Sequence, residues 1–279
     1  MISSKKYVAA FFFAASVLIP LLSIASSSDI EVRRDILKKE PEVTQPTTDK
    51  VFTGASYEFG VVDLPSGGQD WTVVTGRIAY IYNHLQLPYF QFSRYLRGSV
   101  ANYTYDFGGY YKFGRCYLNL EGGFGSDVTF AYKEKALAEF SHPIVGSLYL
   151  KEKYKFLHDV SEDIHILSPG LDYYFGDHYI EAEFDAAITN DRGTAYWGAL
   201  KGYFAASENV YLWLGSAVGE RLYDVMGFAV PSDEFGFIVY GGLKRKIVKN
   251  LFLDITLLYG QEDPDFHHRS VTAGLSYKF

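Results

Sequence analysis

The stretch Val271-Thr-Ala-Gly-Leu-Ser-Tyr-Lys-Phe279, at the carboxy-terminal end of the chain, decides the fold. Apolar residues alternate along it with small or polar ones. In a β-strand, successive side chains point to opposite faces, so this pattern predicts a strand with one apolar and one polar face. The apolar face is formed by Val271, Ala273, Leu275, Tyr277 and Phe279.

A final strand of this kind, ending on Phe, is typical of bacterial outer-membrane barrels, whose assembly machinery reads the last strand. We therefore interpret Val271, Ala273, Leu275, Tyr277 and Phe279 as a barrel-assembly signal. An amphipathic edge strand in a soluble protein is the alternative interpretation. Outer-membrane lipid, lipopolysaccharide and the barrel-assembly machinery are the partners that this signal predicts.

The amino-terminal segment predicts export. Two lysines precede an apolar run that extends from Tyr7 to Ile24, and Ser23-Ile24-Ala25 offers small residues at the cleavage positions. This order is typical of a secretory signal peptide, which we place at residues 1–25 with cleavage near Ala25. A retained membrane anchor is the alternative, although Pro20 interrupts a run that is already near the minimum length of about 17 residues for a span.

Residues 26–50 are polar, mixed in charge and interrupted by Pro41 and Pro46, so we expect a flexible periplasmic tail. A plug docked in the barrel lumen is the alternative for this segment. The remainder, residues 51–279, is the predicted outer-membrane barrel. We expect both ends of this barrel domain to face the periplasm.

Composition supports an antiparallel barrel. The chain has 24 Tyr, 22 Phe and 26 Gly, and no later segment is apolar for long enough to form a spanning helix. Lipid admits only helices and closed barrels as spanning structures, which leaves the barrel. The net charge of −7 and the absence of a basic stripe predict no nucleic-acid partner. The single cysteine, Cys116, excludes an internal disulfide.

Alternation and turn signals from Val51 onward predict about fourteen strands in an up-and-down transmembrane barrel closed by the C-terminal strand. Twelve strands are the alternative, because the stretch from Gly125 to Phe140 has the weakest pattern. Ser141-His142 is expected in a short turn. The expected ranges are 51–62, 70–82, 85–97, 100–113, 115–126, 128–139, 143–157, 162–175, 177–189, 193–206, 208–219, 234–248, 250–261 and 267–279.

Period-two assignment also predicts which side chains enter the lumen. Charges facing lipid are costly, so charged positions in the strands are expected to face inward. The stretch from Ile180 to Ala186 shows this best, with Glu181, Glu183 and Asp185 alternating with apolar residues. A sugar or cation pathway would use the same positions. The candidate lumen-lining residues are Asp106, Lys112, Glu181, Glu183, Asp185, Trp197, Asp254 and Lys278.

The run GLDYYFGDHYIEAEFDAAITNDRGTAYWGALKGYFAASENVYLWLG, residues 170–215, resembles the core of the YaiO-type outer-membrane β-barrel family. In that family a Tyr-Phe-Gly-Asp turn joins two aromatic strands, as at residues 174–177 here. The resemblance implies an outer-membrane location and an association with surface polysaccharide systems, including polysaccharide export components as partners. It brings no catalytic residues to these positions.

The sequence offers little for catalysis. Ser141-His142 and His267-His268-Arg269-Ser270 are the candidates for a hydrolase at the barrel rim, and neither matches a known hydrolase signature. The acidic run at residues 262–265 lacks the ligand spacing of a calcium loop. We therefore expect no catalytic residue, metal or cofactor. The function that we expect is that of a non-enzymatic channel or a polysaccharide-associated barrel. A structural or adhesive barrel is the alternative, and a rim hydrolase is the more distant one. The loop from Glu220 to Asp233, with Met226, Phe228 and Val230, is a candidate constriction.

Overall fold

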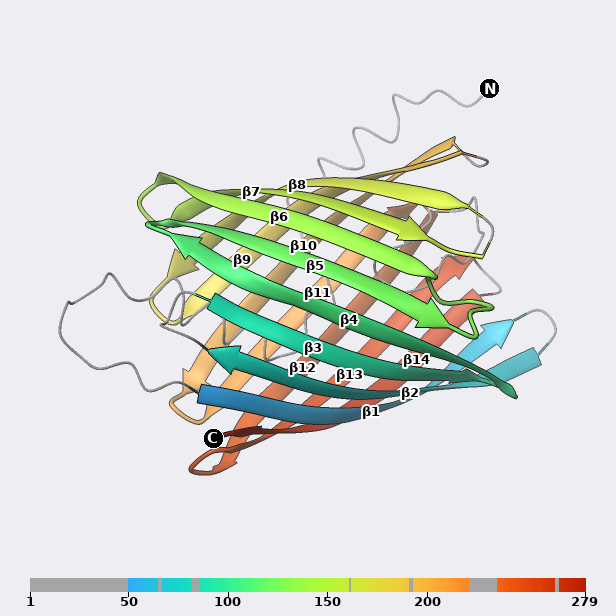
Figure 1. Cartoon of the computed structure of the whole chain (residues 1–279), viewed down its shortest axis with the longest axis horizontal. Helices are drawn as coiled ribbons and strands as arrows, with labels where there is room; N and C mark the ends of the chain where they lie inside the picture. The colour runs from blue at the N-terminus through green and yellow to red at the C-terminus, as the bar shows by residue number, and fades with distance from the viewer. Residues whose placement is uncertain are drawn as a thin grey trace.

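Backbone pairing closes the chain into a single cylinder in the computed structural model, which describes residues 50–64, 67–81, 86–160, 162–190, 193–220, 235–263 and 266–279. The predicted signal peptide at 1–25, nearly all of the tail at 26–50 and the candidate constriction loop after Glu220 lie outside these residues. Figure 1 shows the barrel from the side, with its strands tilted across the wall.

The described residues form 14 antiparallel strands in the order of the chain, and the last strand pairs with the first. The strands are β1 (Lys50–Leu64), β2 (Gly67–Ile81), β3 (Gln86–Arg97), β4 (Val100–Phe113), β5 (Cys116–Ser126), β6 (Glu134–Val145), β7 (Leu148–His158), β8 (Asp163–Phe175), β9 (His178–Thr189), β10 (Gly193–Ser207), β11 (Val210–Glu220), β12 (Phe235–Val248), β13 (Leu251–Asp263) and β14 (Phe266–Lys278).

The register between β1 and β14 closes the barrel. Phe52 lies opposite Lys278, and the pairing continues without a shift to Asp63 opposite His267. The backbone N–H of Phe279 donates to the carbonyl of Val51 at 2.9 Å. We call this end of the barrel the terminal end and the opposite end the loop end.

The predicted faces of the last strand are confirmed. The side chains of Val271, Leu275, Tyr277 and Phe279 are exposed on the outer face, whereas Lys278 faces inward and its ammonium lies 4.7 Å above the Phe52 ring. A register error of one residue would have placed Lys278 on the outside. The alternating pattern of this segment therefore specified both the strand and its orientation.

Fourteen strands are confirmed, and the predicted bounds are close for all strands except those predicted at 128–139 and 143–157. The second of these corresponds to β7, which begins only at Leu148. The strand predicted at 128–139 is wrong, because β6 begins only at Glu134 and residues 127–133 form a loop. Ser141 and His142 consequently lie within β6 and not in a turn; the turn follows at Gly146. The apolar alternation of Val128, Phe130 and Tyr132 resembles that of a strand, but these side chains pack inside the barrel.

Large apolar side chains cover both faces of the wall. The outer face exposes many aromatic and aliphatic residues, which suits contact with lipid. On the inner face, Trp71, Trp197 and their neighbours form a buried cluster with the loop residue Ala131. In the part of the chain that the structure describes, no helix has the length and apolarity that a membrane crossing requires.

The outer face can be tested at the middle of β13. Leu257 is exposed outside, while the neighbouring Thr256 faces the lumen. We expect Leu257→Arg to lower the free energy of unfolding by about 2–4 kcal/mol, because the cation must enter lipid. Urea unfolding in lipid vesicles, followed by tryptophan fluorescence, measures this change.

Thr256→Arg is the matched control, and it should cost clearly less than Leu257→Arg. An equal or larger loss for Thr256→Arg would contradict the assignment of the two faces.

Candidate functional site

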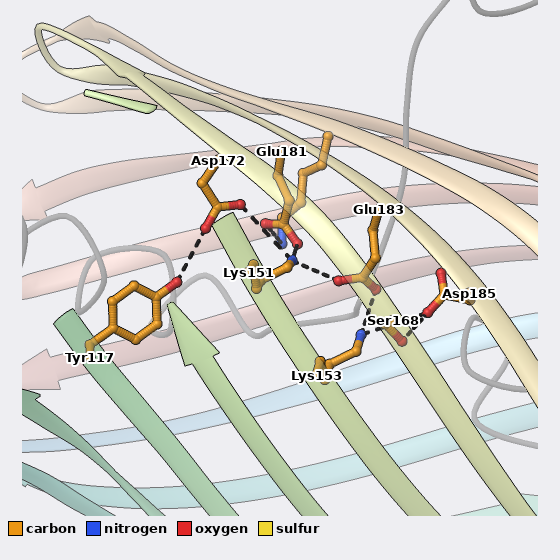
Figure 2. Close-up of polar contacts among 9 residues, drawn as sticks. Tyr117, Lys151, Lys153, Ser168, Asp172, Glu181, Glu183 and Asp185 are labelled. Atoms are coloured by element: carbon orange, nitrogen blue, oxygen red, sulfur yellow. Dashed lines mark hydrogen bonds and ion pairs between the residues drawn. The ribbon is translucent and has the colours of Figure 1, made fainter. Parts of the chain in front are cut away.

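The inner face of β7, β8 and β9 carries a dense group of charges, which we call the lysine–carboxylate network. Alternation places Lys151 and Lys153 of β7 inward, and it does the same for Glu181, Glu183 and Asp185 of β9. Figure 2 shows these side chains converging within the lumen, together with Ser168 and Asp172 of β8 and Tyr117 of β5. All of these residues are buried.

Lys151 is the centre of the lysine–carboxylate network. Its ammonium forms ion pairs with Glu181 and with Glu183, the latter at 2.6 Å, and lies 4.0 Å from Asp172. Asp172 in turn accepts a hydrogen bond of 3.2 Å from the hydroxyl of Tyr117. A buried cation with several carboxylates in reach stays charged, since each carboxylate offsets part of its desolvation cost.

Lys151 of β7 reaches β9 because the residue of β8 that lies between them, Gly170, has no side chain. Gly170 lies opposite Lys151 on one side and Glu183 on the other. A Cβ atom at Gly170 would lie 3.1 Å from the Cε of Lys151 and 2.8 Å from the carbonyl oxygen of Ala182. The lysine side chain therefore passes over a position that must remain without a side chain.

The second lysine extends the network toward the loop end. The Lys153 ammonium lies 2.5 Å from Glu183 and 4.0 Å from Asp185. Asp185 also accepts a hydrogen bond from the hydroxyl of Ser168. On the far side, Lys201 of β10 lies 3.7 Å from Glu181. Four adjacent strands are thus joined by side-chain charges in addition to their backbone ladders.

A second polar group lies on β3 to β6. Lys135 forms an ion pair with Glu121 and lies 3.4 Å from Asp106. Tyr89 donates to Glu121, and the Tyr132 hydroxyl donates to Asp106 at 2.6 Å. Burial raises the pKa of the Tyr132 phenol above its usual value, so this hydroxyl remains a donor.

Residues 127–133, which we call the inward segment, fold into the lumen at the loop end. The carbonyl oxygen of the Asn102 side chain accepts hydrogen bonds from the backbone N–H groups of Thr129, Phe130 and Ala131, at 2.9–3.1 Å. Its amide nitrogen donates to the carbonyl of Asp127 at 2.7 Å and to the hydroxyl of Thr129 at 3.0 Å. One side chain on β4 therefore holds the whole turn of the inward segment.

Packing fixes the inward segment further. A Cβ atom at Gly125 would lie 2.3 Å from the carbonyl oxygen of Tyr132, so the chain can turn back only over a glycine. The ring of Phe130 lies 6.2 Å from that of Trp71, and the guanidinium of Arg97 lies 6.0 Å from Phe130. Ala131 is almost completely buried. The inward segment thus narrows the lumen at this end.

The structure places all eight candidate lumen residues on the inner face, but in different surroundings. Glu181, Glu183 and Asp185 belong to the lysine–carboxylate network, and Asp106 belongs to the second polar group. Trp197 is only 2% exposed and packs in the buried apolar cluster, so its ring does not line an accessible path. The others lie toward the terminal end: Lys112, Asp254 and Lys278.

Sequence analysis missed the cations that complete the lysine–carboxylate network. Lys151 and Lys153 alternate with Leu150, Glu152 and Tyr154, so period two alone could have placed them inward. Asp172 follows the same rule on β8. Their convergence on β9 depends on the pairing of strands and on Gly170, which no local pattern contains.

The candidate hydrolase residues do not form a catalytic arrangement. Ser141 is buried on the inner face, whereas the adjacent His142 belongs to the outer face. At the start of β14, His268 and Ser270 both face inward, but the Ser270 hydroxyl is hydrogen-bonded to Glu58, and Glu58 lies 4.0 Å from His268. A serine nucleophile would need its histidine as the proton acceptor.

Within the described residues, no group of three or more His, Cys, Asp or Glu side chains has the geometry of a metal site. The lumen offers fixed charges and hydrogen-bonding groups instead. Such an interior can bind, exclude or guide a polar solute.

No known family model matches the chain, and no curated protein matches its sequence. Solved structures do match its fold. A bacterial polysaccharide outer membrane secretin has a TM-score of 0.57 at 9% identity, covering 82% of this chain and 98% of that one. Omp33, an outer membrane protein of Acinetobacter baumannii, has a TM-score of 0.50 at 10% identity over 82% and 99% of the two chains.

An outer membrane channel from Pseudomonas putida F1 is similar as well, with a TM-score of 0.51 at 10% identity over 87% of this chain and 100% of that one. The fold of this chain is that of outer-membrane β-barrels. This likeness agrees with the closed register and the apolar outer face described above.

Lys151 should be critical for stability. Lys151→Met leaves Glu181 and Glu183 buried without their main cation, and we expect a loss of about 3–5 kcal/mol in the free energy of unfolding. Urea unfolding in vesicles measures it. Lys246→Met is the matched control, because Lys246 lies half-buried at the terminal end, outside the network. Equal effects of the two substitutions would contradict the central role of Lys151.

Proposed function

We propose that this chain is a non-enzymatic channel of the outer membrane, with its terminal end in the periplasm. The closed barrel with an apolar outside and a charged inside is the observation that carries the proposal. Barrels of eight strands are filled by side chains, and those of 16–18 strands hold an aqueous channel. A barrel of 14 strands leaves room for a narrow path.

The path runs along the wall of β14 and β1. The inner residues of β14 and β1 are mainly small, including Ser56, Gly274 and Ser276, whereas β7 to β11 present lysine, tyrosine and tryptophan. Bulky side chains therefore occupy the part of the lumen beside β7 to β11. The inward segment forms the constriction of the path at the loop end.

Polysaccharide is the cargo class that we propose for this channel. The likeness to a polysaccharide outer membrane secretin supports it, as does the resemblance of residues 170–215 to the YaiO-type family. A structural or adhesive barrel without transport is the second candidate, since the lumen is packed by charged and apolar side chains.

Single-channel conductance in planar bilayers tests the channel. The refolded wild-type barrel should conduct, and heat-modifiable gel migration should confirm that it is folded. Folded protein without conductance would favour the structural or adhesive barrel.

Asn102→Leu tests the constriction. The substitution removes the side chain that holds the inward segment, with hydrogen bonds worth about 1 kcal/mol each. We expect lower stability and a larger conductance than in the wild type, because the segment is released from the lumen.

Asn119→Leu is the matched control, as Asn119 also lies buried on the inner face, on β5. It should leave the conductance near that of the wild type. An unchanged conductance in Asn102→Leu would mean that the inward segment does not limit the path.

A further inference from the structure

A carboxyl group lies on the apolar outer face of the barrel. Lys151 and Lys153 of β7 point into the lumen, so the residue between them, Glu152, points outward, and its side chain is exposed. Glu152 is the fifth of the 11 residues of β7, which places it well inside the wall and away from both ends. A carboxyl group that faces lipid is costly, and an ionisable residue in such a position usually has a function.

The neighbours of Glu152 on the outer face are apolar. Phe140 of β6 and Pro169 of β8 lie directly opposite it, and Leu167 and Leu171, on either side of Pro169, are exposed. Pro169 has no backbone N–H, and the pairing of β8 with β9 omits Pro169 and the residue before it. Among the described residues, none forms an ion pair or a hydrogen bond with the Glu152 side chain. This patch of the wall therefore differs from an ordinary lipid-facing surface in two ways.

A cation with similar surroundings lies on β3. Arg94 is exposed on the outer face, where Val74 of β2 and Tyr103 of β4 lie directly opposite it. Along β3 its outward neighbours are Phe92 and Leu96. Among the described residues, no carboxylate pairs with the Arg94 guanidinium.

The other described arginines of the outer face differ from Arg94. Arg269 forms an ion pair with Asp63 at the loop end. Arg245 is exposed on β12 near the terminal turn, at the opposite end of the barrel. The outer face thus has one carboxylate inside its apolar wall, Glu152, and one arginine without an acidic partner toward the loop end, Arg94.

A single barrel cannot bring Arg94 and Glu152 together. The strands that carry them, β3 and β7, are four strands apart in the wall, with β4, β5 and β6 between them (Figure 1). Two copies in one membrane can do so, because they have the same orientation and both strands run from the terminal end to the loop end. Arg94 is the ninth residue of β3 and Glu152 the fifth of β7, an offset of four residues. On tilted strands this corresponds to roughly 10 Å, which an arginine and a glutamate side chain span together.

We propose that this protein associates with copies of itself in the membrane, with β7 of one copy against β3 of the next and Glu152 paired with Arg94. The pairing relieves both charges of their exposure to lipid, and the low polarity of the surroundings strengthens it. The contact joins two different surfaces, so each copy retains one surface of each kind for a further copy. Because these surfaces lie four strands apart in a wall of 14, successive contacts turn in one sense and close into a ring.

Counting the copies in lipid vesicles tests the association. Cys116 is the single cysteine of the chain, so each copy carries one fluorophore, and stepwise photobleaching counts the copies in a particle. The whole chain is refolded into vesicles with a large excess of lipid. The wild type should bleach in several steps. E152L and R94L should each bleach in a single step, and heat-modifiable gel migration verifies that they are folded. Leucine suits a lipid-facing position, so neither substitution should impair folding.

An equal mixture of E152L and R94L identifies the partner of each charge. E152L retains Arg94 and R94L retains Glu152, so one contact can form between them, and the mixture should contain pairs but no larger assemblies. R245L is the matched control, because it also removes an exposed arginine from the outer face. It should assemble as the wild type does.

The alternatives give different counts. A wild type that bleaches in a single step overturns the inference. Assembly of E152L alone or of R94L alone also overturns it, since the contact would then use like surfaces or neither charge. A mixture that remains monomeric, or loss of assembly in R245L, would show that these two residues are not the pair. None of these counts depends on whether the barrel conducts.

Discussion

The structure depends on the pairing of β1 with β14. A strand in lipid has no water to satisfy its backbone N–H and C=O groups, so an open edge is costly and the sheet must close on itself. Here closure is continuous from Phe52 opposite Lys278 to Asp63 opposite His267. This single register fixes which residues of every other strand face inward, because all strands are paired in sequence.

The charges of the lumen follow from that constraint. Once the outer face is committed to apolar residues, the inner positions can carry lysines and carboxylates, and the low polarity of the wall makes their mutual pairing strong. Lys151 and Glu183 meet across an intervening strand, which requires both the correct register and the absence of a side chain at Gly170. The pairing of charges in the lumen therefore depends on the strand register, and the register depends on the closure of the barrel.

The sequence predicted the fold well, because its main signal is local. Alternation in Val271–Phe279 and in Ile180–Ala186 depends only on neighbouring residues, and strand faces follow from it. The inward segment could not be predicted in this way. Val128, Phe130 and Tyr132 alternate as in a strand, and their place in the lumen depends on contacts with distant residues, among them Asn102 and Trp71. The lysine partners of Glu181 and Glu183 were likewise hidden, since their meeting depends on strand pairing.

Gly170 has a mechanical consequence. Because Lys151 passes over it to β9, the strands β7, β8 and β9 are fastened to one another by side chains as well as by backbone. The wall of β14 and β1 is lined mainly by small residues, and its described inner-face links are those of Glu58 to His268, Ser270 and Thr272. The barrel thus has a stiff sector and a compliant one. We expect thermal motion of the barrel wall to be greater opposite Gly170, where the strands can shift without breaking the lysine–carboxylate network.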